Sequence, residues 1–96
     1  MERPKLTHVA LRFQGKVWSL PRPYRHHHII SMIMYLDGHY GSGELTSVDT
    51  YGDDQGFLDE TGRYLTRPQA EVSAELNGQI KNGKIIGSVL TSEDLW

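Results

Sequence analysis

The sequence contains no cysteine and no long apolar run, and each absence removes a class of protein. Without cysteine the chain has no disulfide framework, no thiolate chemistry and no zinc knuckle. Its longest apolar stretch, residues 29–36, falls far short of the roughly 18–20 residues that cross a bilayer. The first residues, Met1 to Lys5, are polar and lead into a strand-like segment, so no signal peptide is expected. These features predict a cytoplasmic protein without a membrane partner.

Positive charge is missing from the middle of the chain, although the net charge is only −2. Residues 1–36 carry six Lys or Arg, one acid and four of the five histidines, whereas residues 37–62 carry seven acids and no Lys or Arg. One interpretation is two solvated faces of opposite sign that partly neutralise each other. The other is a basic segment that attracts a small anion beside an acidic stretch that repels a long polyanion. Duplex nucleic acid is not expected as a partner, because the domain as a whole lacks the basic footprint.

Motifs for metal binding and nucleophilic catalysis are also missing. The sequence has no H-E-x-x-H, no H-x-H pair on a strand, no EF-hand loop and no serine in a G-x-S-x-G elbow. Consecutive helical residues point about 100° apart, so His26-His27-His28 cannot all ligate one metal ion. Gly41-Ser42-Gly43 lacks a phosphate-binding frame and indicates a flexible loop. We therefore predict no metal, no cofactor and no catalytic residue.

The first third of the chain predicts a hairpin followed by a helix. Residues 7–13 alternate, with Val9, Leu11 and Phe13 on one side, which indicates a half-buried strand. Gln14-Gly15 is a turn, and residues 16–20 form the partner strand. From about residue 24 to residue 36 the apolar spacing becomes helical, and Asp37-Gly38 is expected to end this helix. Residues 37–55 are then a long loop, which is either functional or contains a short element.

The second half predicts another hairpin and another helix. Residues 56–58 and 63–65 flank the turn 59–62, in which Gly62 supplies a positive φ. Thr66-Arg67-Pro68-Gln69 is typical of a capping box, and Gly78 is expected to be the C-cap of the helix that it starts. A small-residue face on this helix, extended by Val72 and Leu76, permits close packing; its small residues are Ala70, Ser73, Ala74 and Asn77.

The end of the chain predicts a turn at Asn82-Gly83, a strand from Lys84 to Leu90 and a final capped turn at 91–96. Together these elements predict one α+β domain spanning residues 1–96, with two β-hairpins and a late strand packed against two main helices. Trp96 either closes the core or docks on another subunit. A chain with so small a core and an aromatic end favours a homo-oligomer, most simply a two-fold dimer.

Motifs along nearly the whole chain resemble those of small proteins of unknown role from bacteriophage and prophage genomes. The segments that carry the resemblance are Lys16-Val17-Trp18-Ser19-Leu20-Pro21, Arg25-His26-His27-His28-Ile29-Ile30, Gln55-Gly56-Phe57-Leu58, Gly62-Arg63-Tyr64-Leu65, Arg67, Ala70, Gly78-Gln79-Ile80 and Leu90-Thr91-Ser92-Glu93-Asp94-Leu95-Trp96. The resemblance implies a viral or prophage accessory protein in the bacterial host cell. It brings no activity and no catalytic residue. Small phage proteins of this size often inhibit host defence, either by binding a protein or by sequestering a nucleotide signal.

The candidate binding site is the basic, histidine-rich start of the first predicted helix. Free N–H groups and the helix dipole favour an anion there. We expect the ligand contacts to come from Arg22, Tyr24, Arg25, His27 and His28, with Tyr24 placed to stack on a base. His26 projects onto the buried face, which favours a hydrogen-bonded core histidine, and plain solvent exposure is the alternative for His28.

Three functions fit this sequence. The first is a non-enzymatic phage protein that binds an anionic, nucleotide-like signal and so inhibits host defence. The second is a protein–protein inhibitor of a defence complex that uses the acidic stretch 44–60 to mimic nucleic acid. The third is a small phosphodiesterase with histidines as acid and base. Recovery of intact ligand separates the first from the third, and binding to a defence protein without nucleotide identifies the second.

Overall fold

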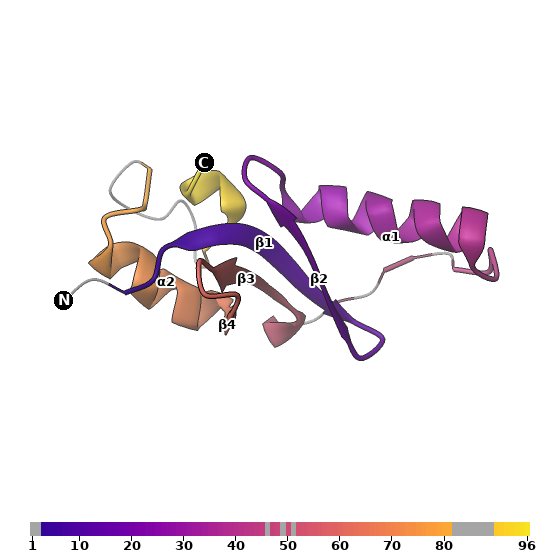
Figure 1. Ribbon diagram of the computed structural model, residues 1–96, viewed down its shortest axis with the longest axis horizontal. Coiled ribbons are helices and arrows are strands. Elements are labelled where there is room, and N and C mark those ends of the chain that lie inside the picture. The colour runs from indigo at the N-terminus through magenta and orange to yellow at the C-terminus, as the bar shows by residue number, and fades with distance from the viewer. Residues whose placement is uncertain (1–2, 46, 49, 51, 82–89) are drawn as a thin grey trace.

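A four-stranded antiparallel sheet, ordered β2-β1-β3-β4, forms the centre of the molecule in the computed structural model (Figure 1). The structure describes residues 3–45, 47–48, 50, 52–81 and 90–96. The strands are β1 (Leu6–Phe13), β2 (Lys16–Pro21), β3 (Gln55–Asp59) and β4 (Tyr64–Thr66). Both predicted hairpins are present, and with two main helices they confirm the α+β class. The predicted turn at Asn82-Gly83 and strand from Lys84 lie outside the described residues, although Leu90 itself is buried.

Each hairpin turn follows from its local sequence. Gln14 and Gly15 have φ values of 53° and 74°, which let β1 reverse into β2. Between β3 and β4, Gly62 has the expected positive φ of 86°, and Oδ1 of Asp59 accepts hydrogen bonds from the main-chain N–H groups of Thr61 and Arg63. Burial alone would raise the pKa of the Asp59 carboxyl, but the hydrogen bonds from Thr61 and Arg63 outweigh it and hold this pKa below its ordinary value.

The first helix, α1 (His26–Tyr40), is longer than the sequence predicted. It continues through Asp37-Gly38 and ends at Gly41, whose N–H donates to the Asp37 carbonyl oxygen at 3.0 Å. A Cβ at position 41 would lie 2.8 Å from Oδ1 of Asp37, so the glycine required at the helix end is Gly41 rather than Gly38. The predicted start of the loop 37–55 is therefore wrong, because the loop begins at residue 41. One of the two alternatives left open for this loop is confirmed, since it contains a short element, the 3-10 helix η1 (Gly52–Asp54), directly before β3.

The second helix, α2 (Arg67–Leu76), begins as predicted. The Thr66 N–H donates to Oε1 of Gln69 at 3.0 Å, and the Gln69 N–H donates to Oγ1 of Thr66 at 3.5 Å, which completes the capping box. The C-cap is Asn77, one residue before the predicted Gly78, and Gly78 follows it with a positive φ of 65°.

The predicted small-residue face of α2 is correct for Ala70, Ser73 and Ala74, which are buried. It does not extend to Val72 and Leu76, which are 44% and 53% exposed. Small side chains bring α2 close to the sheet, and the larger residues of the helix then face away from it.

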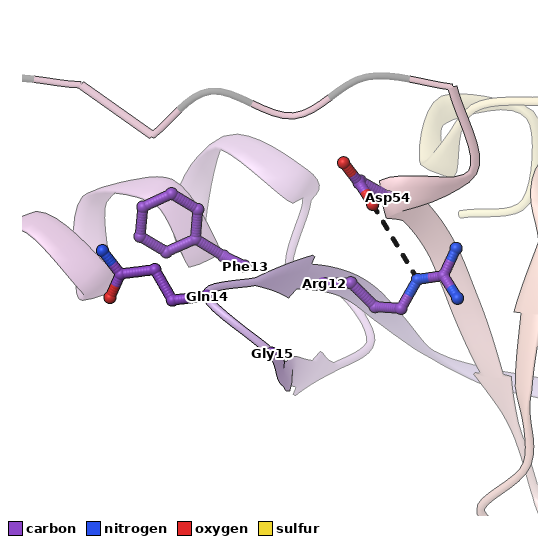
Figure 2. Close-up of a pocket in the computed structure, with 5 residues that line it drawn as sticks. All are labelled: Arg12, Phe13, Gln14, Gly15 and Asp54. Carbon is purple, nitrogen blue, oxygen red and sulfur yellow. Dashed lines mark ion pairs between the residues drawn. The ribbon is translucent and has the colours of Figure 1, made fainter.

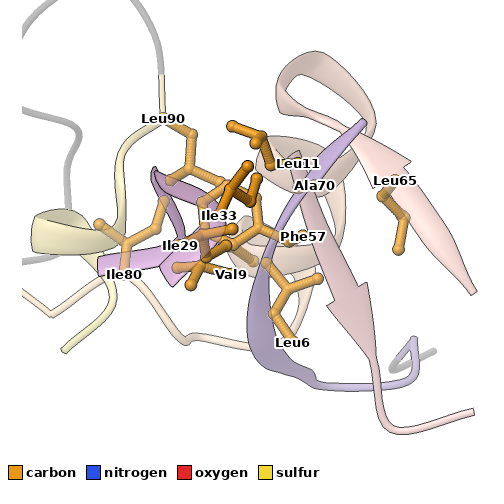
Figure 3. Close-up of a cluster of buried hydrophobic side chains, with 11 residues drawn as sticks. Leu6, Val9, Leu11, Ile29, Ile33, Phe57, Leu65, Ala70, Ile80 and Leu90 are labelled. Carbon is orange, nitrogen blue, oxygen red and sulfur yellow. The ribbon is translucent and has the colours of Figure 1, made fainter. Parts of the chain in front are cut away.

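One face of the sheet carries the hydrophobic core. Val9, Phe57 and Leu65 are paired across β1, β3 and β4, so their side chains point to the same side. Ile29 and Ile33 of α1 and Ala70 and Ala74 of α2 belong to the same buried cluster, so both helices cover this face. Figure 3 shows Ile29 and Ile33 gathered close to Val9 and Phe57.

The sequence predicted that β1 is buried on one face only, but residues on its opposite face are buried as well. Ala10 is fully buried although it alternates with Val9 and Leu11. It pairs with Gly56, and the ring of Tyr64 lies against Gly56, where a Cβ would come 2.1 Å from the Leu65 carbonyl oxygen. On this face the two small residues Ala10 and Gly56 are paired, and the Tyr64 ring packs against Gly56.

The domain is elongated, with extents of 46 × 27 × 22 Å and a radius of gyration of 13.9 Å. A compact chain of this length would have a radius of gyration of about 12.5 Å. Figure 1 shows the source of the difference: α1 extends along the long axis away from α2 and the N-terminus. The end of α1 is accordingly open to solvent, and Tyr40 is 82% exposed.

Candidate functional site

Main-chain hydrogen bonds fix the segment that leads from β2 into α1. The Arg22 N–H donates to the Thr7 carbonyl oxygen at 3.1 Å, and the Tyr24 N–H donates to the Pro21 carbonyl oxygen at 3.0 Å. Proline at 21 and 23 disfavours helical backbone at residues 20 and 22, which precede the prolines. Arg22 and Tyr24 thus lie on a segment anchored to the sheet, and Arg25, His27 and His28 follow it at the start of α1.

The first turn of α1 has a cap made by a histidine. The Arg25 N–H donates to Nδ1 of His28 at 2.8 Å, and the His28 N–H donates to the Arg25 carbonyl oxygen at 3.0 Å. His28 takes the position that Glu or Gln occupies in a capping box. Because Nδ1 accepts this hydrogen bond, the neutral ring carries its proton on Nε2, and that N–H remains available as a donor.

His26 is built into the interior, as its position on the helix predicted. Its Nε2–H donates to the Gly56 carbonyl oxygen at 2.8 Å, and its ring meets Phe57 edge to face with 5.2 Å between the centroids. Burial lowers the pKa of His26 below 6.5, and the positive charge of Arg67 lowers it further, against the opposing effect of the hydrogen bonds. His26 therefore positions the helix start and is unavailable to a ligand.

The last residues of the chain support the same segment from the other side. Trp96 donates its indole N–H to the Tyr24 carbonyl oxygen at 2.9 Å and lies edge to face with Phe57. Arg25 donates from Nη2 to the main-chain oxygen of Trp96. Of the two locations that the sequence left open for Trp96, the structure shows the first, since its side chain packs against its own core.

A short 3-10 helix, η2 (Ser92–Asp94), holds this C-terminal segment in place. Oδ2 of Asp94 accepts hydrogen bonds from the N–H and the hydroxyl of Thr91, at 2.9 and 3.1 Å, and the Lys81 N–H donates to the Asp94 carbonyl oxygen. The capped final turn predicted from the sequence is confirmed. It places Trp96 against residues that are 72 positions earlier in the chain.

Four of the five predicted contact residues form one exposed basic and aromatic surface: Arg22, Tyr24, His27 and His28, which we name the α1-start surface. The His28 ring lies 4.1 Å from the His27 ring and 5.4 Å from the Tyr24 ring, between centroids. The fifth residue, Arg25, is half-buried and turned toward Trp96. Nη1 of Arg25 is buried and has no hydrogen-bond partner among the described residues.

The acidic stretch 44–60 does not present all its carboxylates to solvent. Asp59, the last residue of β3, is buried, and Asp54 forms an ion pair with Arg12 at 4.0 Å. Glu60 accepts a hydrogen bond from the Lys5 N–H, while Asp49 lies outside the described residues. Two of the acids thus stabilise the fold, which weakens the case for a nucleic-acid mimic.

A pocket of about 380 Å³ lies at the β1–β2 turn, and Arg12 is the cationic residue that lines it. Figure 2 shows Arg12 extending toward Asp54 and away from Phe13 and Gln14. The Arg12 guanidinium also donates to the Asp53 carbonyl oxygen at 2.9 Å and lies 4.8 Å from the centre of the Tyr64 ring. Its charge is therefore satisfied within the fold.

The described residues contain no group of three or more His, Cys, Asp or Glu side chains that could hold a metal ion. Within the same part of the chain, no helix has both the length and the apolar character needed to span a membrane.

The fold and site define a class: a small α+β domain with both helices on one face of its sheet and a basic, aromatic surface at the start of the longer helix. The chain belongs to the phage T4 y16D protein family, whose model matches residues 6–96. The expected membership of a small phage protein family is thereby confirmed, and the family description states no activity. Neither a search of curated proteins nor a search of solved structures found a match.

Proposed function

We propose that the chain is a non-enzymatic phage accessory protein that binds an anionic, nucleotide-like signal at the α1-start surface. By holding this signal it would inhibit a host defence in the cytoplasm of the bacterial cell. The observation that carries the proposal is the exposure of Arg22, Tyr24, His27 and His28 around the start of a 15-residue helix.

The electrostatics of this helix start favour an anion. The first turn of α1 contains three histidines and no acidic side chain, so nothing local neutralises the positive end of the helix dipole. The Arg22 guanidinium suits a phosphate, because its planar donors match phosphate oxygens. Tyr24 is 47% exposed and offers a ring edge or face to a nucleobase.

His28 and Arg25 have different roles in this proposal. His28 contributes its Nε2–H as a donor while its Nδ1 caps the helix. Arg25 contributes positive charge and the position of the turn, since its Nη2 is bound to Trp96. Its Nη1 is an unused donor within the described part of the chain. Substituting Arg25 would therefore test the fold as well as the site.

The experiment titrates a panel of mono-, di- and cyclic nucleotides into the protein by calorimetry and analyses the recovered ligand. We expect at least one nucleotide to bind and to be recovered intact. The double variant Arg22→Ala, His27→Ala should lose at least tenfold in affinity, which is about 1.4 kcal/mol. The matched control Arg3→Ala, His39→Ala removes the same residue types from exposed positions elsewhere and should stay within twofold.

Three results would contradict the proposal. Equal losses in the two double variants would show that only the overall charge matters. Hydrolysed ligand would favour the phosphodiesterase. Binding to a defence protein without nucleotide, unaffected by the Arg22, His27 variant, would place the function on another surface.

A further inference from the structure

A second cavity lies near the opposite end of α1, where the sequence indicated no site. It has a volume of about 570 Å³, within the range of roughly 300–1,000 Å³ typical of small-molecule pockets. Its apolar walls come from three parts of the chain: Trp18 of β2, Ile33 and Leu36 of α1, and Leu45 of the segment that follows α1. Lys16 and Tyr40 also line it and are exposed, which places them at its mouth.

The wall that contains Leu45 is held by one residue, Asp37. The Asp37 carbonyl oxygen accepts hydrogen bonds from the N–H groups of Gly41 and Gly43, at 3.0 and 3.1 Å. Its carboxylate accepts from the Leu45 N–H at 3.0 Å and from the Ser42 hydroxyl at 3.4 Å. The Gly41-Ser42-Gly43 segment, predicted to be a flexible loop, is thus folded back onto the helix by hydrogen bonds.

The charges at this pocket are not balanced. The Asp37 carboxylate faces the hydrogen-bond donors of the loop that it holds. The ammonium group of Lys16 forms no ion pair or hydrogen bond with the described residues. An occupant therefore meets one available positive charge beside an apolar cavity.

The aromatic side chains define the shape of that occupant. The indole N–H of Trp18 is directed to the Phe13 carbonyl oxygen at 3.4 Å, so the ring itself forms the wall. Tyr40 contributes a second ring. Flat rings stack well against such side chains, and an exposed lysine attracts an anionic group.

We propose that this pocket binds a planar aromatic small molecule that carries one negatively charged group. The ring would lie against Trp18 among the aliphatic walls, and the anionic group would meet Lys16 at the mouth. This site is separate from the α1-start surface, because it uses the second half of a 15-residue helix that is about 22 Å long. It does not depend on the proposed nucleotide function.

The two tryptophans allow both sites to be observed in one experiment. Trp18 lines this pocket, whereas Trp96 supports the α1-start surface through Tyr24. Naphthalene-2-sulfonate is titrated into ¹⁵N-labelled protein while the two indole N–H signals are followed by NMR. We expect a saturable shift of the Trp18 signal with the Trp96 signal unchanged. Inorganic phosphate, an anion without a ring, should leave the Trp18 signal in place.

Two variants test the aromatic contact and the charge interaction separately. Tyr40→Ala should weaken the binding of naphthalene-2-sulfonate about fivefold, since a stacked aromatic contact contributes roughly 1 kcal/mol. Tyr35→Ala is the matched control, because Tyr35 is an exposed tyrosine of the same helix that does not line the pocket. Lys16→Gln should weaken binding two- to fivefold, as expected for an exposed charge pair, and should leave the binding of 2-naphthalenemethanol unchanged.

The proposal is overturned if Trp18 does not respond at millimolar probe or if only Trp96 responds. Equal effects of Tyr35→Ala and Tyr40→Ala would also overturn it, as would equal affinity for the charged and neutral naphthalenes. Loss of the Trp18 response leaves the nucleotide proposal standing, because that proposal predicts a response at Trp96.

Discussion

The two helices begin in different ways. The start of α2 is specified by four consecutive residues, in which Thr66 and Gln69 exchange hydrogen bonds across Arg67-Pro68. The start of α1 has a local cap from His28 but also depends on distant residues: the Gly56 carbonyl oxygen accepts from His26, and Trp96 donates to the Tyr24 carbonyl oxygen. A local cap can form as soon as the helix forms, whereas the α1-start surface exists only when the sheet and the C-terminal segment are in place.

The largest expected effect is that of Trp96→Ala. It removes the indole hydrogen bond to Tyr24 and the contact with Phe57, and we expect a loss of about 2–3 kcal/mol in the free energy of unfolding because the side chain is only partly buried. Tyr40→Ala, at the exposed end of α1, should change this free energy by less than about 0.5 kcal/mol. Urea denaturation measures both, and similar midpoints for the two variants would contradict the comparison.

A smaller effect is expected at the start of α2. Thr66→Ala removes the N-cap and should cost about 1 kcal/mol in the free energy of unfolding. Thr66→Ser keeps a hydroxyl acceptor at the N-cap and serves as the control, with an unfolding free energy close to that of the wild type. The Thr66→Ala variant should keep its affinity for a nucleotide at the α1-start surface, because the Thr66 cap affects only the start of α2. An unchanged denaturation midpoint would show that Thr66 does not cap α2.

His26 makes the α1 start sensitive to pH. Its pKa is lowered in the fold, chiefly by burial, so the unfolded chain binds a proton more readily than the folded one. The stability that neutral His26 contributes is present above pH 6.5 and is lost as the pH falls through the lowered pKa. Urea midpoints should therefore fall between pH 7.5 and 5.5, and His26→Gln should reduce this dependence while the exposed-residue control His39→Gln retains it. The same pH dependence in wild type and His26→Gln would contradict the assignment.

The outer faces of the helices also differ, and this bears on assembly. On α2 the exposed side chains include Val72 and Leu76, whereas α1 exposes His27, His28 and Tyr35. We expect a two-fold dimer that buries the α2 residues, with twice the monomer mass of 10.9 kDa. Light scattering at tens of micromolar protein measures this mass. A monomer would contradict it, and a dimer unaffected by Leu76→Glu would place the contact elsewhere.

The sequence predicted those parts of the fold whose signals are local. Both hairpin turns, the Thr66 capping box and the interior position of His26 were read from neighbouring residues, and the structure confirms them. The end of α1 was predicted at Asp37-Gly38, where a glycine follows the apolar residues. The structure has it at Tyr40, because Asp37 accepts hydrogen bonds from the residues after the helix, which the local sequence does not reveal. Ala10 is buried in the sheet beside Gly56, its partner in β3 46 residues away in the chain, which alternation within β1 cannot reveal.

The candidate site was only partly predictable for the same reason. Basic and aromatic residues within one turn identify the exposed part, because neighbours in sequence remain neighbours at a helix start. The attachment of Arg25 to Trp96 spans 71 residues and has no local signal. The role of His28 as a cap could have been found, since residue N3 of a helix is where a capping acceptor is expected.

The central claim, an anion held at the α1-start surface, is tested most directly by one calorimetric comparison. The tightest-binding nucleotide is titrated in low and high salt into wild-type protein and the Arg22→Ala, His27→Ala variant. Salt screens the attraction between exposed charges and an anion, so wild-type affinity should weaken as salt is added. The variant should bind at least tenfold more weakly and lose most of the salt dependence. A variant that binds as tightly as wild type at both salt concentrations would contradict the claim and show that the α1-start surface does not bind the anion.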